Sequence, residues 1–381
     1  MNVPKISVII AMFNAEKFIG DALDSLLEQT FRDFEVIVVD DCSTDGSHSI
    51  VQSYAEKFGG RLKLFRLPKN SGNNGIPNNR GLALSRGQYV LFMDSDDAVT
   101  PDALEKLYDA AKIFDADVVG AERYYEVPDE FWNDKNYRRQ LKPVSYQKGG
   151  FVSKPTLISA DFSERVKDCY NFRFLWNIWS KLIRRDFLIE NEISITNEMA
   201  NDMLLTCFLV FSAERYVLIP DTINFYRLLA GSLTHKTDDP KKYFRRYARA
   251  MIVGFNHLEK FLSGREFFIQ HPDMKNLALE IYVREILNYL IGMYQKFPAH
   301  EFDEILRQEF SKNSAALSAY IFSSMNVYML NFFSARQKIF ELEEIIRRDK
   351  VTVAALEKIN RQDKAYISEL EKLAAKLLPE E

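Results

Sequence analysis

The sequence predicts an α/β domain at the N-terminus, followed by a helical region. Between residues 5 and 121, short apolar runs alternate with segments of helical periodicity. The runs are apolar on both faces, which is typical of parallel strands buried between two layers of helices. The predicted order is strand 6–10, helix 16–29, strand 34–39, helix 47–58, strand 62–65, helix 78–85, strand 89–93, helix 101–114 and strand 117–120.

Composition narrows the class of protein. The chain has 381 residues, 47% of them hydrophobic, which is enough for two domains or for one domain with appendages. A net charge of -4 gives no indication of a nucleic-acid partner. The cysteines Cys42, Cys169 and Cys207 are too widely spaced for a metal box or a disulfide framework, which indicates a reducing compartment. We see no export signal before the first strand and expect a cytoplasmic protein.

An acidic motif follows the predicted strand 89–93. It reads Asp94-Ser95-Asp96-Asp97, and ligands of open parallel sheets bind beyond the carboxyl ends of the strands. Carboxylates crowded at one point repel each other unless a cation neutralises them, and oxygen ligands suit Mg or Mn. The alternative interpretation is a solvated acidic turn that caps the following helix.

Several motifs in a fixed order resemble those of family 2 glycosyltransferases with the GT-A fold. The similarity is dense to about Val119 and patchy to about His235. The resembling segments are 7–14, 25–30, 38–46, 70–72, 87–90 and 94–97, in that order.

The resemblance implies a nucleotide-diphosphate sugar donor, most often UDP-linked. Asp41 is the best match for the uracil contact, although it could instead cap the helix at Ser47. Cys42 replaces the usual glycine beside it, and Asn78 stands where similar enzymes often carry arginine. The implied contacts with the nucleotide sugar are Ala11, Phe13, Asp40, Asp41, Asn70, Asn78, Arg80, Asp94, Ser95, Arg227 and His235.

The expected cofactor is a divalent metal ion, Mn or Mg. We expect Asp96 to bind the ion directly, with Asp94 and Asp97 around it. The ion would offset the charge of the diphosphate as the sugar bond breaks. For Ala11, Phe13, Arg80 and His235, ordinary structural roles remain open alternatives.

Inverting transfer requires a general base on the acceptor side. The family usually has Glu-Asp at the start of a helix here, and this chain has Asn201-Asp202. Asp202 is the predicted base, and the loss of a neighbouring negative charge at Asn201 should lower its pKa. Glu198 is a weaker alternative, and Asp202 could instead be a helix cap.

Acceptor contacts are predicted at Trp176 and Trp179, which would share one helix face and stack on a sugar. Burial in the core is the alternative for both. The expected acceptor is a growing surface glycan, teichoic-acid-like or lipid-linked. The stretch between Tyr124 and Asp168 reads as an irregular insertion.

The remainder of the chain reads as helical. The helix after Pro240 has a basic face. Its alternative interpretations are a binding surface for anionic lipid, a binding surface for a polyanionic acceptor, and a face that is exposed to solvent. Residues 313–335 carry no charge, which favours a buried or interface helix over a membrane span. Heptads over 339–377 predict a coiled coil and a homo-oligomer, or else one amphipathic helix.

The predicted domains are a GT-A catalytic domain at 1–236, with a nucleotide-sugar half to about 121 and an acceptor half after it. A helical domain at 237–335 and a coiled-coil helix at 336–381 follow. We expect an inverting, metal-dependent glycosyltransferase, with possible peripheral membrane contact. The alternatives are an inactive scaffold of the same fold, and a sugar nucleotidyltransferase. The second would require a glycine-rich basic loop after the first strand, which residues 13–16 do not supply.

Overall fold

The structure is a computed structural model and describes residues 3–145, 150–171, 173–229, 240–294 and 308. Residues 1–314 form one compact unit. The uncharged segment 313–335 and the predicted coiled coil at 336–381 lie outside the described residues. Among the helices that are described, none combines the length and apolar character needed to cross a bilayer.

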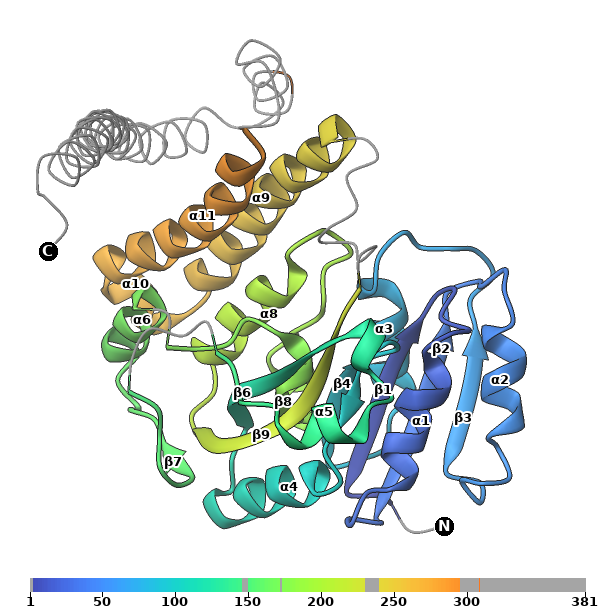
Figure 1. The fold of residues 1–381 in the computed structure, drawn as a ribbon. Coiled ribbons are helices and arrows are strands. Elements are labelled where there is room, and N and C mark those ends of the chain that lie inside the picture. The colour runs from blue at the N-terminus through green and yellow to red at the C-terminus, as the bar shows by residue number, and fades with distance from the viewer. Residues whose placement is uncertain (1–2, 146–149, 172, 230–239, 295–307, 309–381) are drawn as a thin grey trace, which may run out of the picture. The chain divides into compact units, whose positions relative to one another are not determined.

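The unit is built on one sheet (Figure 1), in which the strand order is β3-β2-β1-β4-β8-β6-β9-β5 and β7 pairs with β9. The core strands β1, β2 and β4 are almost completely buried, which agrees with their apolar character on both faces. The bounds are β1 (Ile6–Met12), β2 (Phe34–Asp40), β3 (Leu62–Arg66), β4 (Tyr89–Asp94), β5 (Ala98–Val99), β6 (Val118–Pro128), β7 (Thr156–Leu157), β8 (Lys181–Arg184) and β9 (Tyr216–Leu228).

The predicted α/β architecture is confirmed, as a mixed sheet. Strands β1, β2, β3 and β4 are mutually parallel, and β6 is parallel to β9. Strand β8 lies antiparallel between β4 and β6, and β5 and β7 are antiparallel to β9. The antiparallel strands β5, β7 and β8 come from the region after residue 97, where the sequence alternation of strand and helix becomes irregular.

Helices cover both faces of the parallel half. Side chains of α1 and α4 join the core cluster with one face of β1, through residues such as Leu23 and Leu104. Helix α3 lies on the opposite face, and a Cβ added at Gly81 would stand 2.3 Å from Ile9 Cγ2. The helix bounds are α1 (Ile19–Leu27), α2 (Ser47–Ser53), α3 (Gly75–Leu84), α4 (Ala103–Phe114), α5 (Lys135–Arg139), α6 (Phe162–Tyr170), α7 (Arg185–Glu190), α8 (Asn201–Val210), α9 (Pro240–Ser263), α10 (Glu266–Gln270) and α11 (Pro272–Tyr294).

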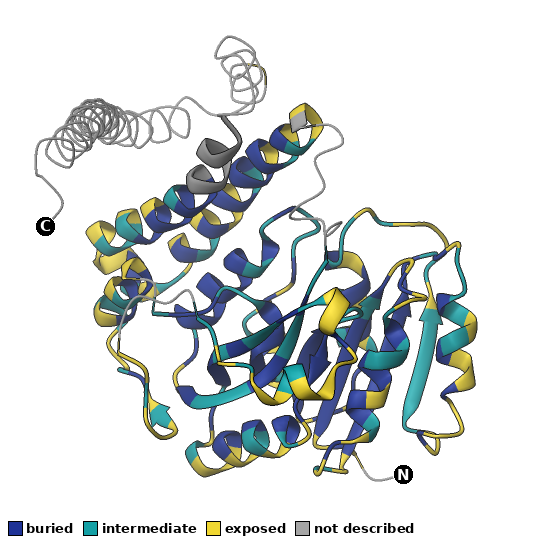
Figure 2. Cartoon of the chain, viewed as in Figure 1, coloured by how far each residue is buried: buried dark blue, intermediate teal, exposed yellow. Residues whose placement is uncertain are grey.

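The helical character predicted after Pro240 is confirmed for the described part. Helix α9 packs on α8 and α11, and α11 also contacts α6. Figure 2 shows the amphipathic pattern of α9, with dark blue buried positions along one side and yellow exposed positions along the other. The buried side includes Phe244, Tyr247, Met251 and Phe255.

One local prediction is wrong. The sequence predicts one helix face shared by Trp176 and Trp179. The chain instead forms a short 3-10 turn, Ile178–Ser180, and then enters β8. Asn177 is extended, with φ -57° and ψ 127°, so the two tryptophans do not share a helical face. The predicted irregular insertion contains the end of β6, a 3-10 turn at Asp129–Phe131, α5, β7 and most of α6.

Candidate active site

The strand register brings the predicted acidic residues to one edge of the sheet. Ala11 at the end of β1 pairs with Val39 of β2 on one side and with Asp94 of β4 on the other. Met12 pairs with Asp40 in the same register. The carboxyl ends of three parallel strands therefore meet, as the sequence predicts, where ligands of such sheets bind.

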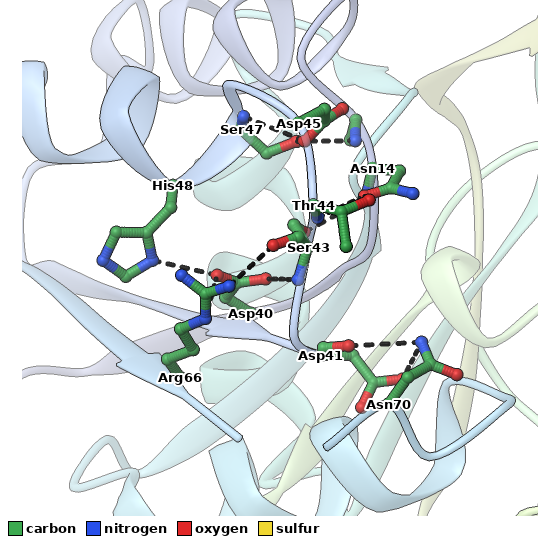
Figure 3. A network of polar contacts seen from close by, with 11 residues as sticks. Asn14, Asp40, Asp41, Ser43, Thr44, Asp45, Ser47, His48, Arg66 and Asn70 are labelled. Atoms are coloured by element: carbon green, nitrogen blue, oxygen red, sulfur yellow. Dashed lines mark hydrogen bonds and ion pairs between the residues drawn. The ribbon is translucent and has the colours of Figure 1, made fainter. Parts of the chain in front are cut away.

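Asp40 is occupied by its own loop (Figure 3). Its Oδ1 accepts from the backbone N–H of Ser43 at 2.8 Å, and its Oδ2 lies 2.9 Å from Nδ1 of His48. Arg66 Nε lies 3.6 Å from the same oxygen. With 0% exposure, Asp40 is a support for the loop after β2, and a direct contact with a nucleotide stays a prediction.

Asp41 faces the other side of that loop and holds the segment 70–74, here called the donor loop. Its carboxylate accepts from the backbone N–H of Ser71 at 2.9 Å, from Ser71 Oγ at 2.9 Å and from Asn70 Nδ2 at 3.1 Å. Burial raises the pKa of Asp41, and the charge of Asp40 adds to this effect. Asp41 does not cap α2, because the residue before that helix is Gly46 and no side chain caps it.

The other predicted donor contacts differ in accessibility. Phe13 is 47% exposed beyond the end of β1, so the core interpretation does not hold for it, and Ala11 is partly exposed. Asn78 is buried on α3, and its Oδ1 has no hydrogen-bond partner within the described residues. Arg80 lies exposed on the same helix. His235 lies outside the described residues.

The acidic motif is electrostatically strained. Burial raises the pKa of Asp94 well above its usual value, and the charges of Asp96 and Asp202 raise it further. Burial also raises the pKa of Asp96 and Asp97, and Asp94 and Asp96 add to the effect on Asp97. Asp202 therefore faces the same space as the motif. The motif is no solvated acidic turn, because solvent would screen these charges.

Arg227 is held by protein groups. Its Nη1 donates to Asp129 Oδ1 at 2.9 Å, its Nη2 pairs with Asp21, and its Nε donates to the carbonyl oxygen of Asp96 at 3.0 Å. The guanidinium also lies 3.7 Å from the centre of the Trp132 ring. In place of the predicted contact with the nucleotide sugar, the structure shows Arg227 anchoring the backbone of the acidic motif.

Two of the three predicted metal ligands fit a divalent ion. Asp94 and Asp96 are crowded carboxylates whose pKa values are raised, and a cation between them would relieve that cost. Asp97 does not fit, because its Oδ1 accepts from Arg227 N at 3.0 Å and its Oδ2 from Asn224 Nδ2 at 3.2 Å. Within the described residues no group of three potential ligands converges on one point, so an ion would need oxygens of the substrate as well.

The predicted base Asp202 lies in the first turn of α8. Burial raises its pKa to about 6, against the opposing effects of the Lys181 charge and a hydrogen bond from the backbone N–H of Ile178. The expected effect of Asn201, a pKa lower than a neighbouring glutamate would give, stays a prediction, because the observed rise comes from desolvation. Ala200, with no side-chain hydrogen bond, is the N-cap, so Asp202 is not the helix cap.

Glu198, the alternative base, is paired. Its Oε1 lies 3.6 Å from Nε of Arg249 on α9. Its backbone carbonyl accepts from Asn73 Nδ2 of the donor loop at 2.6 Å. Since Arg249 already pairs with Glu198, Asp202, whose pKa is raised to about 6, is the better candidate for a proton acceptor near neutral pH.

The two predicted acceptor residues differ in exposure. Trp179 is 2% exposed, and its ring centre lies 5.2 Å from that of Tyr124 and 5.9 Å from that of Tyr226. Trp176 is partly exposed, and its carbonyl accepts from Thr206 Oγ1 of α8 at 2.9 Å. The core alternative therefore describes Trp179, and Trp176 remains a predicted acceptor contact.

Sequence reasoning missed Lys181. This side chain is 1% exposed, and its Nζ donates to the carbonyl oxygens of Leu175 and Asn177 at 2.7 and 2.6 Å. Burial lowers its pKa to about 7, while the charge of Asp202 opposes that shift. The sequence does contain a signal that could have identified Lys181. It is a lone lysine inside an apolar run, between Ile178-Trp179-Ser180 and Leu182-Ile183, and a charge in such a run needs a buried partner.

Comparisons with known proteins agree with this geometry. The chain is 28% identical over 259 residues to an uncharacterized glycosyltransferase, EpsJ of Bacillus subtilis, covering 67% of this chain and 71% of that protein. It is 30% identical over 236 residues to the cholesterol galactosyltransferase of Borreliella burgdorferi, covering 60% and 62%. It is 45% identical over 229 residues to the poly(ribitol-phosphate) beta-N-acetylglucosaminyltransferase TarS of Staphylococcus aureus, covering 58% of this chain but 35% of TarS.

Among solved structures, a crystal structure of S. aureus TarS residues 1–349 in complex with UDP-GlcNAc is similar in fold. The TM-score is 0.53 at 23% identity, covering 81% of this chain and 91% of that one. Residues 7–168 match the family model described as Glycosyl transferase family 2. This region, which contains Asp41 and the complete acidic motif, covers less than half of the chain and is similar to glycosyltransferase family 2.

Proposed function

We propose that this protein transfers a sugar from a UDP-linked donor to an acceptor hydroxyl, with inversion at the anomeric carbon. The observation that carries the proposal is the position of Asp202, which lies near enough to Asp94 for its charge to raise the pKa of Asp94 and which itself has a pKa of about 6. A base with a pKa near the working pH is mostly ionised and still accepts a proton well.

In the proposed reaction Asp202 accepts the proton of the acceptor hydroxyl while that oxygen attacks the anomeric carbon. The bond between this carbon and the phosphate oxygen breaks on the opposite face, and the nucleotide diphosphate leaves with the electron pair. Asp41 and the donor loop hold the nucleotide, and Phe13 packs against the base. A Mn or Mg ion on Asp94 and Asp96 would neutralise the charge that develops on the diphosphate.

We further propose an anionic, phosphodiester-containing saccharide as the acceptor. The first turns of α9 carry Lys241, Lys242, Arg245, Arg246 and Arg249 and no acidic residue. This basic row adjoins the site, because Arg246 Nη2 donates to the carbonyl of Gly72 at 3.4 Å and Arg249 pairs with Glu198. The TarS relatives act on poly(ribitol-phosphate), which is an acceptor of this charge.

A panel of nucleotide sugars tests the function. Each donor is incubated with Mn²⁺, with or without EDTA, and the release of nucleotide diphosphate is measured for the wild type, Asp202→Asn and Glu198→Gln. We expect one UDP-sugar to turn over, Asp202→Asn to be nearly inactive, and Glu198→Gln to resemble the wild type. Absence of turnover with every donor would favour an inactive scaffold, and equal loss in both variants would remove Asp202 as the specific base.

A further inference from the structure

Two segments far apart in the sequence meet beside the site, and asparagine side chains join them. Asn197 Nδ2 donates to the carbonyl of Ser71 at 2.7 Å. Asn73 Nδ2 donates to the carbonyl of Glu198 at 2.6 Å. On one side lies the donor loop, which continues into α3, and on the other lies the segment 195–200, which leads into α8. The donor loop and the helix of the proposed base are therefore in direct contact.

The contact is close enough to restrict the residues within it. A Cβ added at Gly75 would stand 2.4 Å from the carbonyl oxygen of Thr196 and 2.8 Å from the Cα of Asn197. No real Cβ makes contacts this short, so any other residue at position 75 would push the two segments apart. Direct backbone contact at this junction therefore fixes the distance between the two segments.

Asn201 lies at the centre of this junction and is 5% exposed. Its Nδ2 donates to Asn74 Oδ1 at 2.7 Å and to the carbonyl of Thr196 at 2.9 Å. Both partners are acceptors, so the position requires a donor. A carboxylate at position 201 would have no proton to donate to these two oxygens. The cost in folding free energy would be about that of one unsatisfied buried polar group. This requirement explains why the chain carries asparagine before Asp202.

The donor loop is also the part of the chain that Asp41 holds, through the hydrogen bonds from Ser71 and Asn70. Contacts therefore run without interruption from Asp41 through the donor loop to Asn201, and Asn201 is covalently next to Asp202. The hydrogen bonds in this series are partly buried and of ordinary length, and the chain itself makes the remaining links. A group bound at Asp41 that changes the position of the donor loop must act on the first turn of α8.

We propose that Asn201 is a positioning residue: it ties the first turn of α8, and with it Asp202, to the donor loop, so that a nucleotide bound at Asp41 fixes the base in place. This inference rests on the function proposed above. Asn201 touches neither substrate in this scheme. Its effect on the reaction is exerted through the placement of the Asp202 carboxylate, and a displacement of about 1 Å can cost on the order of 10²-fold in rate.

Hydrogen exchange of the α8 peptide, with and without UDP and Mn²⁺, tests the link directly. We expect UDP to slow exchange across Asn201–Val210 in the wild type. In Asn201→Asp, which keeps the shape but removes the donor, UDP should bind with nearly wild-type affinity in calorimetry while the protection of α8 is lost. Turnover of the UDP-sugar should fall mainly in kcat, with KM for the donor little changed.

Asn79→Ala is the matched control. Asn79 exchanges two hydrogen bonds with the backbone of Ile195, at 2.7 and 2.9 Å, in the same junction but away from Asp202. It should lower thermal stability while UDP still protects α8. If Asn201→Asp does not fold, Asn74→Ala removes the side-chain amide whose oxygen accepts from Asn201 and should give the same loss of protection.

The outcomes separate the two claims. UDP that binds Asn201→Asp and still protects α8 would overturn the positioning role, as would UDP that binds the wild type without protecting α8. UDP that does not bind the wild type at all would overturn the proposed donor, and this inference with it. Loss of protection in Asn79→Ala as well would show a general loosening of the junction and also contradict a specific role for Asn201.

Discussion

Replacing Asp202 by asparagine should make the protein less active and more stable at the same time. The substitution nearly preserves size and keeps an oxygen that can accept from the backbone N–H of Ile178. It removes a proton acceptor, and general-base catalysis contributes about 10²–10⁴-fold. It also removes a charge that burial disfavours, so the folded state should gain free energy.

The magnitude follows from the pKa. Burial raises the pKa of Asp202 from 3.8 to about 6, and each unit corresponds to about 1.4 kcal/mol. Because the native state binds the proton more tightly, the wild type loses stability as the pH rises between these two values. The full penalty, present above pH 6, is about 3 kcal/mol, and residual contact of the carboxylate with water reduces it to about 2 kcal/mol.

Thermal unfolding of the wild type and Asp202→Asn at a series of pH values checks this. The variant should melt higher at pH 7.5, and the difference should shrink as the pH falls through about 6 and vanish near pH 4. The rate of sugar transfer by the wild type should rise through the same window, since the base must be ionised. A variant that is less stable at pH 7.5, or a difference that does not depend on pH, would refute the reasoning.

Four further predictions follow from single contacts. Asp41→Ala should weaken UDP binding by about 1.5–3 kcal/mol, because it removes a charged hydrogen-bond acceptor and releases the donor loop; unchanged affinity in calorimetry would contradict this. Asp96→Asn should abolish metal-dependent donor binding while the protein stays folded, and full activity in EDTA would exclude it. Arg227→Met should lower thermal stability by about 2 kcal/mol or more, measured by tryptophan fluorescence, because two ion pairs and the anchor of the acidic motif are lost. Gly75→Ala should destabilise by about 1–3 kcal/mol through overpacking, whereas Gly264→Ala, whose added Cβ meets nothing closer than 3.6 Å, should be nearly neutral in the same melt.

The parallel half of the fold and the place of the site were predictable from the sequence. Strands that are apolar on both faces and alternate with helices of crossover length allow few topologies. In those topologies the carboxyl ends of neighbouring strands share one edge, so Asp41 and Asp94 had to meet there. Local sequence patterns are sufficient to predict this half of the fold, because each pattern depends only on residues within one turn or one strand.

The mixed half of the sheet, which contains the antiparallel strand β8, was less predictable. Strand β8 is short, and the preceding Trp176 and Trp179 have the spacing of a helix face, yet the segment pairs with β4 and β6. Periodicity over a few residues does not distinguish a helix from a buried strand, and the partner strands decide. The same holds for Arg227, whose partners Asp21 and Asp129 come from distant parts of the chain.

By itself, the sequence determined the α/β class, the edge of the sheet where the acidic residues gather, and the position of Asp202 as the candidate base. Only the tertiary structure decided what each charge does there. It paired Asp97 with the backbone N–H of Arg227, raised the pKa of Asp202 by burial, and gave Asn201 two acceptors to bind. The physical reason is that burial and hydrogen-bond partners depend on contacts between residues that are distant in the sequence, such as Asp97 with Arg227 and Asn74 with Asn201, and these contacts leave no periodic trace in the chain.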